Sequence, residues 1–177
     1  MNLPQEYQWL PNATGIPQWL SIGLKYYGLR EGPGSADNPT IMEWAHGFGI
    51  TWYIHDSIAW CSLFAGEVTK ESGLVPPDKD HLLAAISWAP WGIVILKPFL
   101  GCYMVFNRPG GHHIGWYVGE DDEAYHVLGG NTGDAVGFAR IAKSRLITAR
   151  WPTGVPLPIN TNKILLSASG ALSTNES

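Results

Sequence analysis

Residues 102–128 read CYMVFNRPGGHHIGWYVGEDDEAYHVL, and this segment indicates the fold more directly than any other part of the chain. Its three apolar and aromatic runs are separated by Pro-Gly-Gly at 109–111 and by Gly-Glu-Asp-Asp at 119–122. Both separators are typical turn sequences, so the pattern predicts antiparallel strands joined by hairpins. The predicted strands cover residues 102–107, 113–118 and 123–128.

The chain before this segment has helical spacing instead. Apolar residues from Trp19 to Tyr26 recur at helical intervals after Pro17, which suits the first turn of a helix. The predicted helices cover residues 17–28, 38 to 47 or 49, 60–71 and 79–88, and short strands are expected at 135–139 and 146–150. Helices followed by strands predict the α+β class, with N-terminal helices packed on a small antiparallel β-sheet.

Length and composition are those of one globular domain. A chain of 177 residues can bury a real core, and nine tryptophans with few charged residues argue against disorder. We expect a single domain over residues 1–152, of which 1–15 form an N-terminal arm. Residues 153–177 are rich in Pro, Ser, Thr and Asn, and we expect them to form a C-terminal tail.

Charge and hydropathy exclude several kinds of partner. The net charge is −4 and no basic stripe is present, which argues against nucleic acid. The N-terminus lacks the basic and apolar regions of a signal peptide, and no apolar run reaches membrane-spanning length. We therefore expect synthesis in the cytoplasm without a signal peptide, and no integral membrane segment.

Cys61 is the first candidate for chemistry. Residues 56–64 pass from a polar loop into an apolar, helix-like stretch, so its thiol is expected at or near a helix N-terminus. Free backbone N–H groups and the positive end of the helix dipole favour a thiolate there, which predicts a lowered pKa. Cys102 is expected to be a small buried apolar residue, and two cysteines do not make a disulfide framework.

Histidines on the predicted strands supply candidate bases for that thiol. His113 shares a strand face with Gly115, which leaves space for a cleft, whereas Ile114 belongs to the core face. If the next hairpin closes around residues 119–120, His126 becomes a cross-strand neighbour of His113, although a one-residue slip would separate them.

These residues suggest nucleophilic catalysis by a triad. Cys61 would attack a carbonyl carbon, and His113 would take up the thiol proton and later protonate the leaving amine. His126 would orient the imidazole ring of His113.

Four motifs in order resemble the NlpC-like cysteine peptidases, and more narrowly the phage and prophage branch of that family. They lie at residues 58–64, 111–119, 125–131 and 149–152, and Asn-Pro-Thr-Ile at 38–41 also fits. The resemblance covers about residues 16–152. It implies a papain-like core, no cofactor and no metal, and a hydrolase that cleaves an amide bond in the peptides of bacterial peptidoglycan.

The resemblance also implies roles for single residues. Cys61 matches the nucleophile of the family, and His113, in His-Ile-Gly-Trp, matches its base. His126 matches the third polar residue, and Asn131 in Gly-Gly-Asn is the rival for that position. The chain departs from the family at Cys102, where aspartate is common, and after Asn131, where glutamine is frequent.

A different class of function is the alternative to an enzyme. The same fold could form a non-catalytic module that binds the cell wall or a virion component. The intact set of Cys61, His113 and His126 favours the bacteriolytic, endolysin-like hydrolase. Such a protein would act at the cell wall, reaching it through phage lysis, a virion or a secretion machinery, and the sequence leaves these three routes open.

Overall fold

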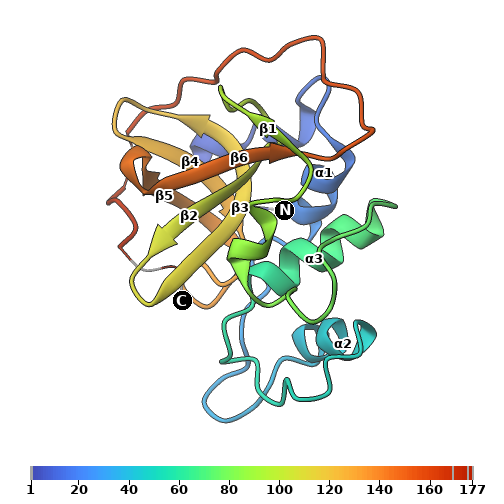
Figure 1. Cartoon of the computed structure of the whole chain (residues 1–177). Coiled ribbons are helices and arrows are strands. Elements are labelled where there is room, and N and C mark those ends of the chain that lie inside the picture. The colour runs from blue at the N-terminus through green and yellow to red at the C-terminus, as the bar shows by residue number, and fades with distance from the viewer. Residues whose placement is uncertain (1, 169, 175, 177) are drawn as a thin grey trace.

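The computed structural model describes residues 2–168, 170–174 and 176, and its centre is an antiparallel β-sheet in the order β1-β6-β2-β3-β4-β5 (Figure 1). The strands are β1 Ile93–Ile95, β2 Tyr103–Arg108, β3 Gly111–Glu120, β4 Ala124–Gly129, β5 Gly137–Ala142 and β6 Leu146–Trp151. The three strands predicted at 102–128 form the successive hairpins β2-β3-β4, so that prediction is confirmed.

The helices precede the sheet in the chain, as expected for the α+β class. They are α1 Gln18–Lys25, α2 Pro39–Gly47 and α3 Cys61–Glu71. Helices α1 and α3 contact the sheet, whereas α2 contacts α3 at the lower end of the molecule (Figure 1). The Asn38 side chain accepts a hydrogen bond of 2.9 Å from the Thr40 N–H, and this cap explains why α2 starts where Asn-Pro predicts.

Two regions between α3 and β2 differ from the prediction. Residues 79–88 form turns and a short 3₁₀ helix, Ala85–Trp88, instead of a regular helix. There Trp88 is fully buried, and its indole N–H donates to the Ser62 hydroxyl at 2.8 Å. Strand β1 was not predicted because three residues are too few to show an alternating pattern.

The core lies between the sheet and the helices α1 and α3. Trp116 of β3 packs edge-on against Phe64 of α3, with ring centroids 5.4 Å apart. Its ring also touches α1, where a Cβ added at Gly23 would lie 3.0 Å from the indole. The tight helix contact therefore depends on Gly23, and full burial of such a ring contributes about 2–3 kcal/mol.

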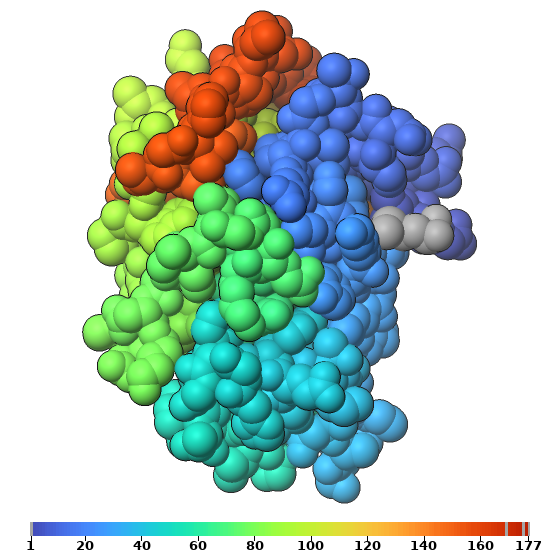
Figure 2. All heavy atoms as spheres, turned by 90° about the vertical axis from the view of Figure 1, so that its right-hand side faces the viewer, coloured from blue at the N-terminus to red at the C-terminus, as the bar shows by residue number. Residues whose placement is uncertain are grey.

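Both ends of the chain pack on the sheet. Tyr7 and Leu10 of the N-terminal arm are buried, so the arm is part of the core. In the C-terminal tail, the Leu166 N–H donates to the Glu120 carbonyl of β3, and the Glu120 N–H donates to the carbonyl of Ile164. The Leu166 side chain fills the space beside Gly119. Figure 2 shows the tail next to the N-terminal segment. Residues of both segments line a hollow of about 960 Å³.

The helices that the structure describes are all too short or too polar to cross a membrane.

Candidate functional site

Cys61 is the first residue of α3, as the polar-to-apolar transition predicts. Trp60 before it is fully buried and donates its indole N–H to a Glu31 carboxylate oxygen at 2.8 Å, which fixes the start of the helix. The Cys61 side chain is buried, and its thiol lies against β3, close enough to the backbone N–H of Ile114 for that group to favour the thiolate.

The end of β4 makes room for this contact. The backbone N–H and C=O of Tyr117 both point toward the β2 side of the sheet. Because these groups alternate in direction along an antiparallel strand, the N–H and C=O of Ile114 point toward β4. Strand β4 ends at Gly129, however, and the pairing of β3 with β4 stops before Ile114. The Ile114 N–H thus has no strand partner and faces the thiol, and Ile114 directly follows His113 in β3.

His113 is fully buried at the same end of β3. It lies on the sheet face opposite Trp116, and its ring covers Gly129, where an added Cβ would lie 2.9 Å from Nε2. In the described part of the chain neither ring nitrogen has a hydrogen-bond partner. No hydrogen bond therefore joins His113 to Cys61 in this structure.

The space beside Gly115 that the sequence suggested for a cleft is occupied. A Cβ at Gly115 would lie 2.4 Å from a methyl group of Val127, so the glycine allows β3 and β4 to pack closely. Neither Cys61 nor His113 lines the large hollow between the two ends of the chain.

Asn131 follows β4 in a left-handed conformation, with φ of 52°. Its side chain is buried, and the amide oxygen has no partner among the described residues; the same holds for the hydroxyl of Thr132. Continuing the register of β3 and β4 would place Asn131 level with His113. Unpaired buried polar groups are rare in proteins, so His113, Asn131 and Thr132 at this end of the sheet call for a functional explanation.

His126 does not lie beside His113, so the prediction that the two are cross-strand neighbours is wrong. In β4 it pairs with Gly119, which is six residues from His113 and about 20 Å along the strand. The hairpin turns at residues 121–123 instead of 119–120, and a bulge between Tyr117 and Gly119 shifts the register further. Register depends on this turn geometry, which strand periodicity does not determine.

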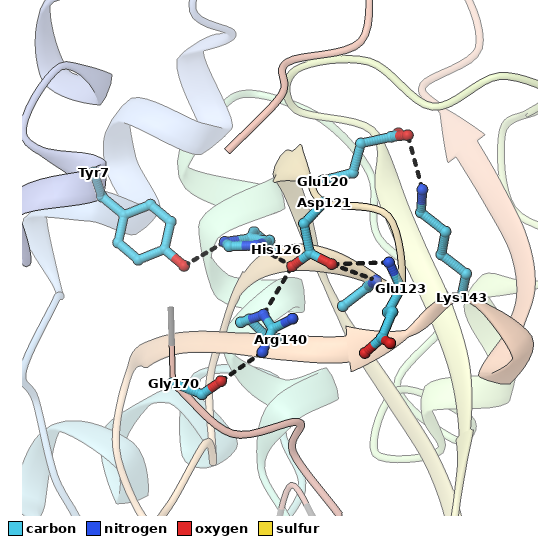
Figure 3. Close-up of polar contacts among 9 residues, drawn as sticks. Tyr7, Glu120, Asp121, Glu123, His126, Arg140, Lys143 and Gly170 are labelled. Atoms are coloured by element: carbon cyan, nitrogen blue, oxygen red, sulfur yellow. Dashed lines mark hydrogen bonds and ion pairs between the residues drawn. The ribbon is translucent and has the colours of Figure 1, made fainter. Parts of the chain in front are cut away.

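Both ring nitrogens of His126 are engaged in a buried network (Figure 3). Nδ1 lies 2.7 Å from the Tyr7 hydroxyl, and Nε2 lies 2.9 Å from an oxygen of Asp121. The Arg140 Nε donates to the same oxygen at 2.8 Å, and this hydrogen bond holds the pKa of Asp121 far below its usual value. The network joins the N-terminal arm to the hairpin and has no contact with Cys61.

Burial dominates the electrostatics of the candidate pair. It raises the pKa of the Cys61 thiol, although the Ile114 N–H, the positive charge of Arg108 and the N–H groups of α3 oppose that change. Burial also lowers the pKa of His113 to about 4. The thiol pKa is thus raised where the helix N-terminus alone predicted it lowered, and both groups are neutral in this closed arrangement.

Cys102 and Asp56 have structural roles. Cys102 is a free, fully buried thiol whose pKa burial raises to about 12, in keeping with its expected role as an apolar residue. Asp56 accepts hydrogen bonds of 2.7 Å from the backbone of Gly32 and of Asn38, and so joins two loops. Among the residues described here, no three His, Cys, Asp or Glu side chains converge to hold a metal ion.

Comparison with known proteins gave no match, either to protein-family models or to curated proteins. The resemblance to NlpC-like peptidases therefore stays a prediction from the motif residues.

Proposed function

We propose that this protein is a cysteine hydrolase that cleaves an amide bond in the peptides of bacterial peptidoglycan, with Cys61 as nucleophile and His113 as base. The main support is the position of the Cys61 thiol at the start of α3, against the part of β3 that carries His113. The ring nitrogens of His113 are buried and have no hydrogen-bond partner among the described residues. The motif resemblance supplies the substrate class and the papain-like core.

The chemistry follows from these groups. His113 takes the thiol proton, and the thiolate attacks the carbonyl carbon, so that a C–S bond forms and the carbonyl oxygen becomes an oxyanion. The unpaired Cys61 N–H at the start of α3 stabilises that oxyanion. The imidazolium then protonates the leaving amine as the C–N bond breaks, and water hydrolyses the thioester to restore the thiol.

Asn131 is the better candidate for the third residue. Its amide oxygen is buried and free to accept a hydrogen bond from the His113 ring, whereas both nitrogens of His126 are occupied by Tyr7 and Asp121. Since the His113 ring lies on the sheet face away from α3 and makes no hydrogen bond to Cys61 here, the catalytic pair forms only when this end of the sheet rearranges.

The decisive experiment is mass spectrometry of purified peptidoglycan after digestion. Wild-type protein is expected to release peptide fragments whose masses identify the bond. Cys61→Ala should reduce release about a thousand-fold or more, while the matched control Cys102→Ala should retain it. A chain ending at residue 168 belongs in the same series. Equal release by wild type and Cys61→Ala would reject the nucleophile.

One observation favours the alternative, a non-catalytic module that binds the cell wall or a virion component. Cys61 and His113 are both buried, so the site is closed to a large substrate. In that case the protein sediments with peptidoglycan and releases no fragment, even after truncation at residue 168. In either case we propose that it acts at the cell wall, reached by phage lysis, a virion or secretion.

A further inference from the structure

The C-terminal tail reaches the end of the sheet where the hairpin joins β2 to β3 (Figure 1). Residues 171, 172 and 174 are exposed, whereas the side chain of Glu176 is fully buried. Its carboxylate lies in the electrostatic range of His113. Hydrogen bonds to Arg140 and Arg145 hold Gly170 and Ser173 of this largely exposed segment, and Glu176 adds a buried acid near the proposed base.

Arg145 binds that acid through both of its terminal nitrogens. Its Nη1 donates to one Glu176 oxygen at 2.9 Å, and its Nη2 donates to the other. This two-point contact is the geometry by which arginine recognises a carboxylate, and the hydrogen bonds are charge-assisted. Arg145 also keeps the pKa of Glu176 below its usual value, against the opposing effect of burial.

The sheet itself holds the guanidinium in place. Its Nε donates to the backbone carbonyl of Asn107 in β2 at 2.7 Å, which leaves the outer edge of the group facing the carboxylate. Strand pairing aligns Leu146 of β6 with Phe106 of β2, and Phe106 with His113 of β3. Arg145, next to Leu146, therefore belongs to the same end of the sheet as His113, two strands away.

His113 supplies an independent sign that a ligand belongs here. Its ring is fully buried among these groups, and neither nitrogen has a partner in the described part of the chain. Arg108 adds a second positive charge within electrostatic range of both His113 and Cys61. A polar, positively charged site covered by an acidic side chain has the character of a site for a carboxylate.

We propose that Arg145 is a carboxylate-binding subsite beside His113, that Glu176 fills it as an internal ligand, and that a carboxylate of the peptide substrate displaces Glu176. The inference deepens the proposed function, on which the identity of the substrate rests. Displacement lifts the end of the tail from His113 and admits water and substrate to this end of the sheet. The subsite selects peptides that carry a free carboxylate near the bond to be cleaved.

Alkylation of Cys61 in the full chain tests the proposal without any need for hydrolysis. Iodoacetate and iodoacetamide are compared, and modification of Cys61 is followed by peptide mass spectrometry, which separates it from Cys102. Glu176→Gln should raise the rate with both reagents about ten-fold, because the end of the tail loses its charge-assisted contact with Arg145. It should also raise the ratio of the iodoacetate rate to the iodoacetamide rate, because Arg145 then attracts the anion.

Three further variants sharpen that test. Glu43→Gln removes an equal charge at an exposed position of α2 and should change neither rate. Arg145→Gln added to Glu176→Gln should return the ratio of the iodoacetate rate to the iodoacetamide rate to that of wild type. Arg145→Lys added to Glu176→Gln should retain part of the preference for the anion. Thermal unfolding of each variant shows whether it is folded.

A binding measurement completes the test. N-acetylglutamate should shift the His113 ring resonances of Glu176→Gln in NMR spectra, and N-acetylglutamine should not. Equal effects of the two compounds, or Cys61 rates that Glu176→Gln leaves within two-fold of wild type, would overturn the subsite. A protein that shows the expected alkylation and binding but releases no peptidoglycan fragment would keep the subsite and refute the proposed hydrolase.

Discussion

The thiol of Cys61 lies beside the backbone N–H of Ile114, where the start of α3 packs against β3. The contact exists because β4 ends at Gly129 and leaves that N–H without a strand partner. The contact places Cys61 beside Ile114, the residue that follows His113 in β3. The His113 ring itself lies on the sheet face away from α3. The proposed site is therefore a closed arrangement that has to open before it can react.

The buried His113 makes stability depend on pH. Its folded pKa is about 4, whereas an unfolded histidine has a pKa of about 6.5, so between these values only the unfolded chain binds the proton. Stability contributed by the neutral ring is present above about pH 6.5 and is lost as the pH falls to about 4, by about 3 kcal/mol. Urea unfolding of wild type and His113→Gln at pH 7 and pH 4 measures this, and parallel losses in both proteins would contradict it.

Gly129→Ala is expected to displace the His113 ring. The new methyl carbon would lie 2.9 Å from Nε2, with the backbone carbonyl of Ile114 3.2 Å away on the same side. We expect a cost of about 1–3 kcal/mol in the free energy of unfolding, and a loss of peptidoglycan hydrolysis. Gly111→Ala on β3 is the matched control, because nothing lies within 4 Å of its added Cβ. Equal stability of the two variants would show that the ring moves freely.

Asn131→Gly separates the backbone role of Asn131 from the role of its amide. Glycine tolerates the φ of 52° at this position, so the stability of the variant should stay close to that of wild type. If the amide oxygen orients His113, hydrolysis should fall about ten- to a hundred-fold. Asn131→Ala should lose the same activity and, in addition, about 1 kcal/mol of stability through backbone strain. Full activity of the glycine variant would remove Asn131 from the mechanism.

The His126 network is expected to affect stability and leave the chemistry unchanged. Tyr7→Phe removes the partner of His126 Nδ1 and should cost about 1–2 kcal/mol, since a buried nitrogen is left unpaired. Tyr27→Phe is the control, because its hydroxyl makes no hydrogen bond in the described structure. Chemical unfolding gives the cost, and Cys61 alkylation in the folded protein should be the same in both variants. A change in the alkylation rate of Tyr7→Phe alone would reconnect His126 with the site.

The central features of the site were predictable because they depend on local pattern. The change from polar to apolar residues before Cys61 marks the start of α3, and the alternation after Gly111 places His113 and Ile114 on opposite faces of a strand. The role of Asp121 was missed, although an acidic residue in a turn is a recognised signal for capping of backbone N–H groups.

The sequence by itself determined the order of the elements and the faces of the strands, because periodicity and turn residues act within a few neighbours. The tertiary structure alone decided which residues meet. A turn two residues later than expected and a bulge moved His126 away from His113, and the ion pair between Glu176 and Arg145 joined the end of the tail to the sheet. Such contacts arise between residues far apart in the chain, where register, strand ends and burial, rather than local pattern, set the energy.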